Sequence, residues 1–477
     1  MSDPLKGKLA RFSDFAAHIL PLEAHFLLQS QRFEDEEKIA ILHSIIDQAG
    51  NPEKKIQFDT SIDKRKYSYV KSWCEKILTN LDVDYNLEKI LQWEHFIRTD
   101  SLSVADDREC RRVISQTEPS DFNFIKIYDV ARVYRHYLQI RLRHKDYVLI
   151  HNFLNRHRTD YEFSRLVNDK LHEATSEIIS DYAYKKNMDY DDSIRWLSSL
   201  FYNENLDGYN RILAWIRLVF IAHNTRRYEL LTDMFILFEK LVTSGRLYSR
   251  RIVTNFYSQY LLYYASMQQF DKAVTCGYYS IKEKNNDHLY YVNNLAAMLL
   301  RSKRPDEALI ILKDAATRAK VTPNMHNKIG HTAYNVFALT DTGKSALAEN
   351  QAFVFLTAYK KEIIEHRWHL FFTAYLKAML TNKNYTGALK TASNFRLLHR
   401  DDQNKTSIIY SPSIPWMILL ASFKNGDLTI ADLKSRLNEL MHINREYVNS
   451  AITHQDLLTL TKIVLNKDFQ KLGMVDT

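Results

Sequence analysis

The feature that most constrains the fold is a short pattern that recurs along the chain. Its clearest copy is KRPDEAL (Lys303 to Leu309), in which a charged, turn-like start leads into an apolar helical stripe. QQFDKAV, from Gln268, and KNYTGAL, from Lys383, have a similar outline, and weaker copies occur elsewhere. The alanine-equivalent position marks eight copies at intervals of 35 to 43 residues: Ile150, Ser193, Leu231, Ala273, Ala308, Ala346, Ala388 and Ala431. A period of this length is typical of stacked repeats.

Each marker lies early in an apolar-periodic segment and follows another such segment. Before KRPDEAL, apolar residues recur at i, i+3, i+4 and i+7 from Val292 to Leu299, which is the spacing of one helix face. We therefore expect each unit to be a pair of antiparallel helices, with the small marker residue allowing their close approach. Such a hairpin cannot bury its apolar face alone, so neighbouring units must stack.

The composition favours the same all-α fold. The 477 residues include only 10 glycines and 8 prolines, well below the usual shares of about 7% and 5%. Strand-rich folds need such residues at their many turns, so this scarcity favours long helices. The 29 tyrosines and 24 phenylalanines argue against a disordered chain.

The segment from Val292 to Ala315 resembles a tetratricopeptide repeat, whose first helix carries Trp, Leu, Gly and Tyr at fixed spacing and whose second carries Ala, Phe and Ala. Trp215, Leu218 and Phe235 match the same frame, including its leading Trp. The resemblance extends roughly from Tyr134 to Asn438 and is most specific in two or three units. It implies a right-handed α-α superhelix.

Three regions are expected from the distribution of the markers. Residues 1–120 lack the marker and are predicted to form an N-terminal helical module or cap. Residues 121–400 would form the array of hairpins similar to tetratricopeptide repeats. Residues 401–477 would form a C-terminal helical repeat and cap, after a polar, proline-containing loop that begins near His399.

Several features favour a soluble, cytoplasmic protein. Cys74, Cys110 and Cys276 are few, odd in number and without metal-like spacing, as expected in a reducing compartment. The most apolar stretch, residues 212–223, is too short to span a membrane and contains Arg217. The N-terminus has no apolar core of the kind found in signal peptides. We expect no membrane partner.

Two short motifs resemble catalytic or nucleotide-binding signatures but lack a required residue. DTGKS (residues 341–345) resembles the end of a phosphate-binding loop, yet Ala338 stands where the first glycine is required. HEATSE (residues 172–177) resembles the zinc-protease motif, yet Ser176 replaces its second histidine. We interpret the first as an inter-helix turn and the second as a solvated helix face.

Glu362, His366 and His369 have the spacing of one helix face and are the remaining candidates for a metal site. Seven residues of helix span about 10.5 Å, too far for three ligands of one ion with bonds of about 2 Å. The histidine pair could still join ligands from another helix. We expect surface histidines, with no metal, no cofactor and no enzymatic activity.

Relatives in the tetratricopeptide family line a concave groove with the first helix of each unit and hold a peptide or protein there. The matching positions here are mostly amides and cations: Asn255, Gln259, Asn293, Asn294, Arg301, Lys328, His331, Asn335 and Lys377. Amides can satisfy an extended peptide backbone, and the cations would favour an acidic side chain or a C-terminal carboxylate. The resemblance thus implies a non-enzymatic scaffold or adaptor, although these residues could also be ordinary exposed polar residues.

The basic run from Arg132 to Lys145 supports an alternative function. It interleaves aromatic residues with five cations, as nucleic-acid surfaces often do: Arg132, Arg135, Arg141, Arg143 and Lys145. Tyr134 and Leu138 also have plain helical spacing, so the rings could form core while the arginines face solvent. The formal charge of +8 permits a nucleic-acid or acidic partner without requiring one.

Overall fold

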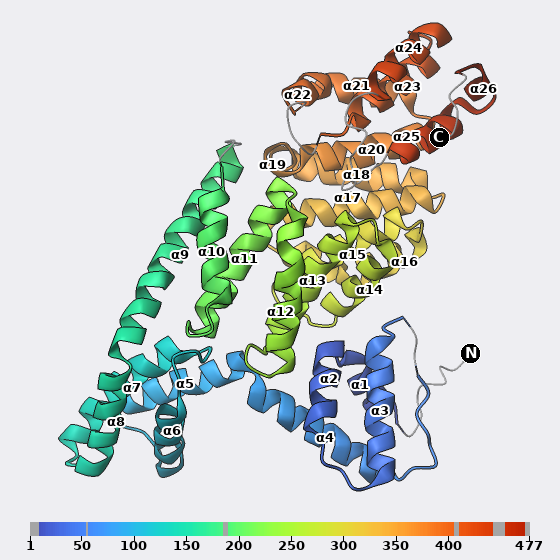
Figure 1. Cartoon of the computed structure of the whole chain (residues 1–477). Coiled ribbons are helices and arrows are strands. Elements are labelled where there is room, and N and C mark those ends of the chain that lie inside the picture. The colour runs from blue at the N-terminus through green and yellow to red at the C-terminus, as the bar shows by residue number, and fades with distance from the viewer. Residues whose placement is uncertain (1–8, 54–55, 185–188, 405–409, 442–453, 473–477) are drawn as a thin grey trace. The chain divides into compact units, whose positions relative to one another are not determined.

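The computed structural model describes residues 9–53, 56–184, 189–404, 410–441 and 454–472, and every regular element in these ranges is a helix (Figure 1). The predicted all-α class is therefore confirmed. The chain divides into two compact units between Phe256 and Tyr257, inside α13 (Arg250–Ser266). The boundaries predicted near residues 120 and 400 stay predictions. None of the described helices is both long and apolar enough for a membrane span.

Unit 1 (residues 1–256) consists of helices joined by short connections. Their bounds are α1 (Ala10–His18), α2 (Pro21–Ser30), α3 (Glu36–Gly50), α4 (Lys64–Leu81), α5 (Val83–Arg98), α6 (Val104–Gln116), α7 (Phe124–Ile140), α8 (His144–Arg156), α9 (Arg158–Tyr184), α10 (Asp191–Tyr202), α11 (Gly208–Thr225), η1 (Tyr228–Leu231) and α12 (Thr232–Thr243), followed by the start of α13. Side-chain oxygens cap several of these helices, as Asp82 does for α5 and Asp207 for α11.

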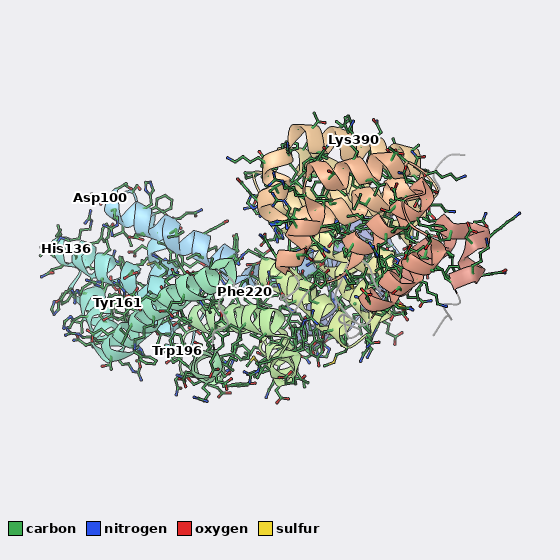
Figure 2. The ribbon with its side chains drawn as sticks, turned by 90° about the horizontal axis from the view of Figure 1, so that it is seen from above. Asp100, His136, Tyr161, Trp196, Phe220 and Lys390 are labelled. Atoms are coloured by element: carbon green, nitrogen blue, oxygen red, sulfur yellow. The ribbon has the colours of Figure 1, made fainter. Side chains whose placement is uncertain are left out.

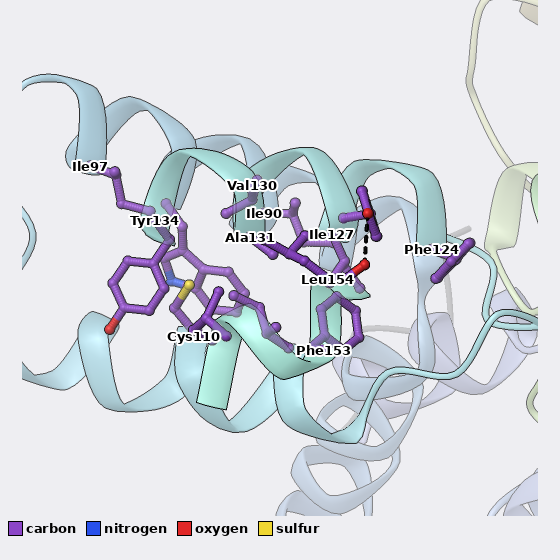
Figure 3. Packing of buried hydrophobic residues seen from close by; sticks show 14 of the residues in the cluster. Ile90, Ile97, Cys110, Phe124, Ile127, Val130, Ala131, Tyr134, Phe153 and Leu154 are labelled. Atoms are coloured by element: carbon purple, nitrogen blue, oxygen red, sulfur yellow. Dashed lines mark hydrogen bonds between the residues drawn. The ribbon is translucent and has the colours of Figure 1, made fainter. Parts of the chain in front are cut away.

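An apolar cluster of α5, α6, α7 and α8 forms one core of unit 1 (Figure 3). Tyr134 and Leu138 are fully buried in it, whereas Ile140 and Leu142 of the basic run are 63% and 89% exposed, so only part of the run forms core. The hydroxyl of Tyr128 donates a hydrogen bond of 2.9 Å to the Leu154 carbonyl oxygen, which joins α7 to α8. A buried hydroxyl with a partner avoids the penalty of an unsatisfied polar group.

A buried ion pair joins segments of unit 1 that lie far apart in sequence. Glu23 on α2 is only 1% exposed, and the guanidinium of Arg250 lies 2.9 Å from its carboxylate. The Tyr248 hydroxyl and the Leu20 backbone amide also donate to Glu23, each at 2.8 Å. Because the carboxylate accepts hydrogen bonds from three groups, the desolvation cost of burying its charge is offset.

Unit 2 (residues 257–477) continues from the rest of α13. Its helices are α14 (Phe270–Ser280), α15 (His288–Arg301), α16 (Pro305–Val321), α17 (Met325–Asp341), α18 (Ser345–Ala358), α19 (Lys360–His366), α20 (Trp368–Thr381), α21 (Tyr385–Asn394), α22 (Leu397–Asn404), α23 (Ser413–Asn425), α24 (Ile430–Met441), α25 (His454–Leu465), η2 (Asn466–Asp468) and α26 (Phe469–Leu472). The pairs α15/α16, α17/α18, α20/α21 and α23/α24 pack as successive hairpins, and each first helix contacts the first helix of the next pair.

One turn geometry recurs at the hairpins of unit 2. After α15, Lys303 has a φ of 59°, its amide donates to the Leu300 carbonyl, and the Arg304 amide donates to the Leu299 carbonyl at 2.8 Å. This pair of hydrogen bonds around a left-handed residue is a Schellman motif, which satisfies the last carbonyls of a helix. The same arrangement recurs at four other turns, where the left-handed residues are Gln268, Gly343, Lys383 and Gly426.

The turns also correct the frame of one predicted marker, Ala346. Ala308 and Ala388 lie five residues after the left-handed residue and are buried between helices, as predicted. Ala346 is exposed, because the residue five positions after Gly343 is Ala348, which is fully buried. Ala431 is exposed as well. The predicted packing role is therefore wrong for Ala346 and Ala431.

Candidate functional site

A group of polar side chains gathers along the first helices α15, α17 and α20 of unit 2, which contact one another in that order. We call this group the polar cluster, and its members are Gln259, Tyr290, Asn293, Asn294, Tyr334 and Arg367. Three of the predicted groove residues, Gln259, Asn293 and Asn294, belong to it. They come from α13 and α15, whereas Tyr334 comes from α17 and Arg367 directly precedes α20.

Tyr290 is the centre of the polar cluster. Its hydroxyl forms hydrogen bonds with Asn294 and Gln259, and Asn294 also lies 3.4 Å from the hydroxyl of Ser258. Burial raises the pKa of Tyr290, although these hydrogen bonds and the nearby Arg367 charge act in the opposite direction. The hydroxyl therefore stays protonated at neutral pH and holds two amide side chains in place.

Gly330 on α17 determines where Arg367 lies. A Cβ atom at Gly330 would collide with a guanidinium nitrogen of Arg367 and would lie 3.1 Å from Nδ2 of Asn293. The glycine therefore lets the guanidinium lie against the backbone of α17, with its centre 6.0 Å from that of the Tyr334 ring. This placement brings the Arg367 charge beside Asn293 and Tyr334.

Asn293 leaves an acceptor unused next to this arginine. Its side chain is only 2% exposed, and its Nδ2 donates to the Asn327 carbonyl at 2.9 Å. Its Oδ1 is buried and accepts no hydrogen bond from the residues that the structure describes. Buried polar atoms normally have partners, so this oxygen is one of the few exceptions in the described part of the chain.

The surroundings of Arg367 carry positive charge. Arg367 forms no ion pair within the described part of the chain. His326 retains solvent exposure, yet the surrounding protein and the charges of Arg367 and His366 lower its pKa to about 4. His326 is therefore neutral at neutral pH, and Arg367 supplies the positive charge of the polar cluster.

Three predicted groove residues make contacts with neighbouring helices of unit 2 instead. Nε2 of His331 donates to a backbone carbonyl of α16 at 2.9 Å, and Nδ2 of Asn335 donates to Gln351 on α18 at 2.7 Å. Lys377 forms an ion pair with Asp341 at 2.5 Å. Each interaction engages one polar group of its side chain within unit 2.

The other three predicted groove residues lie away from the polar cluster. The guanidinium of Arg301 lies 4.8 Å from the ring centre of Phe270, and burial lowers the pKa of this arginine. The ammonium of Lys328 lies 5.2 Å from the ring centre of Tyr359. Asn255 is half-buried and belongs to unit 1, so it is considered apart from the surface of unit 2.

The basic run in unit 1 is partly neutralised by carboxylates. Arg143 makes bidentate hydrogen bonds to Asp107 at 2.7 and 2.8 Å and also pairs with Asp146. Burial of Asp107 works against its ionisation, but these hydrogen bonds lower its pKa. Arg141 pairs with Asp100. Three cations of the run have no ion pair among the described residues: Arg132, Arg135 and Lys145.

The short catalytic-like motifs take structural positions. Gly343 of DTGKS is the left-handed residue of a turn between α17 and α18, so a helix and not a strand precedes it. Glu362 and His366 belong to α19, whereas His369 belongs to α20, because the helix breaks at Arg367. The expectation that the three share one continuous helix face is therefore wrong. The described residues contain no group of three or more potential metal ligands.

Tyr290, Tyr334 and Arg367 were not among the residues predicted from the sequence. Tyr290 stands four residues before Asn294, so it shares a helix face with a predicted groove position, and that spacing could have indicated it. No comparable signal exists for Arg367, because its place depends on the break before α20 and on a glycine of another helix.

Comparisons of the chain with protein-family models, with curated proteins and with solved structures find no match.

Proposed function

We propose that this protein is a non-enzymatic helical-repeat scaffold or adaptor that binds an acidic segment of another protein on the polar cluster. We also infer that the hairpins of unit 2 wind into a right-handed superhelix similar to tetratricopeptide repeats, with the first helices on the concave side. The recurrence of one turn geometry and the successive contacts of α15, α17 and α20 support this arrangement.

The observation that carries the proposal is the position of Arg367. Its guanidinium lies against Gly330, near the side-chain nitrogen of Asn293, and it forms no ion pair with the described residues. A carboxylate of a partner would supply the missing charge through bidentate hydrogen bonds. The amides of Asn294 and Gln259 would pair with the partner's backbone, since an amide both donates and accepts.

Recognition is the whole mechanism in this proposal. The helices hold the polar cluster in place before a partner arrives, so few side chains lose freedom on binding. Asn294 and Gln259 are already oriented by the Tyr290 hydroxyl. We further propose, from the sequence, that the protein works in the cytoplasm without a cofactor.

Selection from a displayed library of extended random peptides, with the full-length chain as bait, tests the proposal. We expect peptides rich in Asp and Glu to bind the wild-type chain and to lose at least tenfold in affinity with R367A. K377A is the matched control, because Lys377 is already neutralised by Asp341 and its loss should change affinity less than twofold. Equal losses in both variants, or no acidic preference, would refute the assignment.

The basic run of unit 1 remains a second candidate, because Arg132, Arg135 and Lys145 have no ion pair among the described residues. It would serve a regulatory or nucleic-acid-associated function. A gel shift with single- and double-stranded nucleic acid at low salt distinguishes this candidate. Retardation that weakens steeply with added salt would favour it, and no retardation would remove it.

A further inference from the structure

A second surface of unit 2, away from the polar cluster, has unusual apolar exposure. On α18, Leu347, Phe353 and Val354 are 47%, 57% and 59% exposed. Single exposed apolar residues are common, but a concentration on one helix indicates an interaction site. Phe353 also lines a groove of about 560 Å³ between α18 and α21, together with Tyr375 and Met379 of α20.

A basic hollow continues this groove. It has a volume of about 530 Å³ and is lined by four cations, two on α19 and two around the start of α22: Lys360, Lys361, Arg396 and Arg400. Glu365 is the one carboxylate in its lining, and it lies 3.8 Å from Lys361. Asn394 borders both the groove and the hollow, so the two form one surface.

Positive charge also borders the groove. Lys390 lines it and is labelled in Figure 2. The only carboxylate in the groove lining, Glu349, accepts hydrogen bonds from the side chains of Asn382 and Asn384. The groove and hollow together thus contain five cations and two carboxylates, and both carboxylates already have partners within the chain.

We propose that the α18/α21 surface, meaning the groove together with the basic hollow, binds an amphipathic helix of a partner protein. The partner's apolar side chains would lie against Phe353, above the buried floor of Tyr375 and Met379, and its carboxylates would pair with the cations of the hollow. Helix-in-groove recognition uses apolar anchors at i, i+3, i+4 and i+7. The cations also speed the encounter with an acidic partner.

The apolar part of the surface decides between a protein and a nucleic acid. Nucleic acid would use the cations of the hollow and an aromatic ring such as Phe395, over which Lys360 lies at 5.2 Å. It has no aliphatic side chains to cover Phe353 in the groove, or Leu347 and Val354, which are exposed on the same helix outside the groove lining. A partner with apolar residues on one face and acids at one end matches both halves of the surface.

The test is fluorescence anisotropy with the full-length chain and a labelled synthetic helix of about 18 residues, which spans about 27 Å. The peptide carries Leu and Phe on one face and Glu near one end. A second peptide has every Glu replaced by Lys. We expect the acidic peptide to bind at least tenfold more tightly than the basic one.

Two chain variants probe the two halves of the surface separately. F353D, in the groove, should lower the affinity for the acidic peptide at least tenfold. K360E/R396E, in the hollow, should lower it by at least the same factor. K313E, a charge reversal at an exposed position of α16, should change affinity less than twofold. Circular dichroism confirms that each variant keeps its helices.

Several results would overturn the proposal. One is equal binding of the acidic and basic peptides, and another is unchanged binding by F353D. Another is tighter binding of single-stranded RNA than of the peptide, with a dependence on Lys360 and Arg396 but not on Phe353. That result would assign the hollow to phosphate instead. R367A leaves this surface intact, so the outcome is independent of the function proposed for the polar cluster.

Discussion

Gly330 is the residue on which the geometry of the polar cluster depends. In G330A the new methyl group would displace the end of the Arg367 side chain, which is flexible. Alanine also has the higher helix propensity, by about 1 kcal/mol. We therefore expect stability to be unchanged or raised by up to about 1 kcal/mol, with binding of acidic peptides weakened at least fivefold. Thermal unfolding and anisotropy measure the two effects, and tight binding by G330A would contradict the role of Arg367.

Asp207 should make stability depend on pH. This fully buried N-cap of α11 has its pKa raised to about 6 by burial, against the opposing hydrogen bonds of Asn210 and Ser164. The folded state then binds more protons than the unfolded state between pH 4 and 6, so stability falls as pH rises through this window. The difference in unfolding free energy between wild type and D207N should change by about 2 kcal/mol between pH 4 and 7. If urea titrations gave the same difference in unfolding free energy at pH 4 and pH 7, this prediction would be contradicted.

Opposite effects on stability are expected for two residues that share one backbone conformation in the turns within hairpins. Lys303 and Gly343 both have positive φ, at 59° and 79°. K303G should stabilise the protein by about 0.5–1 kcal/mol, because only glycine adopts this conformation without strain. G343A should destabilise it by about 1 kcal/mol. K313G, within α16, is the control and should destabilise by about 1 kcal/mol. Chemical denaturation checks all three signs.

The helical hairpins could be predicted because their signal is local. Apolar periodicity from Val292 to Leu299 and the turn at Lys303 both operate within a few residues. The packing position predicted at Ala346 was wrong because the prediction matched residue types there. The turn geometry at Gly343 places Ala348 at the packing position instead. Sequence similarity between turns does not reveal which residue takes the left-handed conformation.

The candidate site could be predicted only in part, because it depends on contacts between helices. Asn293 and Asn294 were expected from their place on a first helix, and both lie in the polar cluster. Lys377 was expected as a binding cation, yet Asp341, 36 residues earlier, neutralises it. Arg367 acquires its position from Gly330 on α17. Such pairings between separate helices leave no local pattern.

Long-range pairing also contributes to the stability of unit 1. Glu23 and Arg250 are 227 residues apart in the chain, and their ion pair joins α2 to the start of α13. E23A should destabilise unit 1 by about 3–5 kcal/mol, because a partly buried arginine and the Tyr248 hydroxyl lose their acceptor. E34A, at an exposed position between α2 and α3, should change stability by less than about 0.5 kcal/mol. Hydrogen exchange of the amides of α2 compares the two, and equal protection would show that the pair is dispensable.

Hydrogen–deuterium exchange of the full-length chain, with and without a selected acidic peptide, tests the central claim about the polar cluster most directly. We predict slower exchange at the starts of α15, α17 and α20, with α16 unchanged, and loss of this protection in R367A. Protection confined to α16 or to unit 1, or protection that survives in R367A, would contradict the claim that the polar cluster holds the partner.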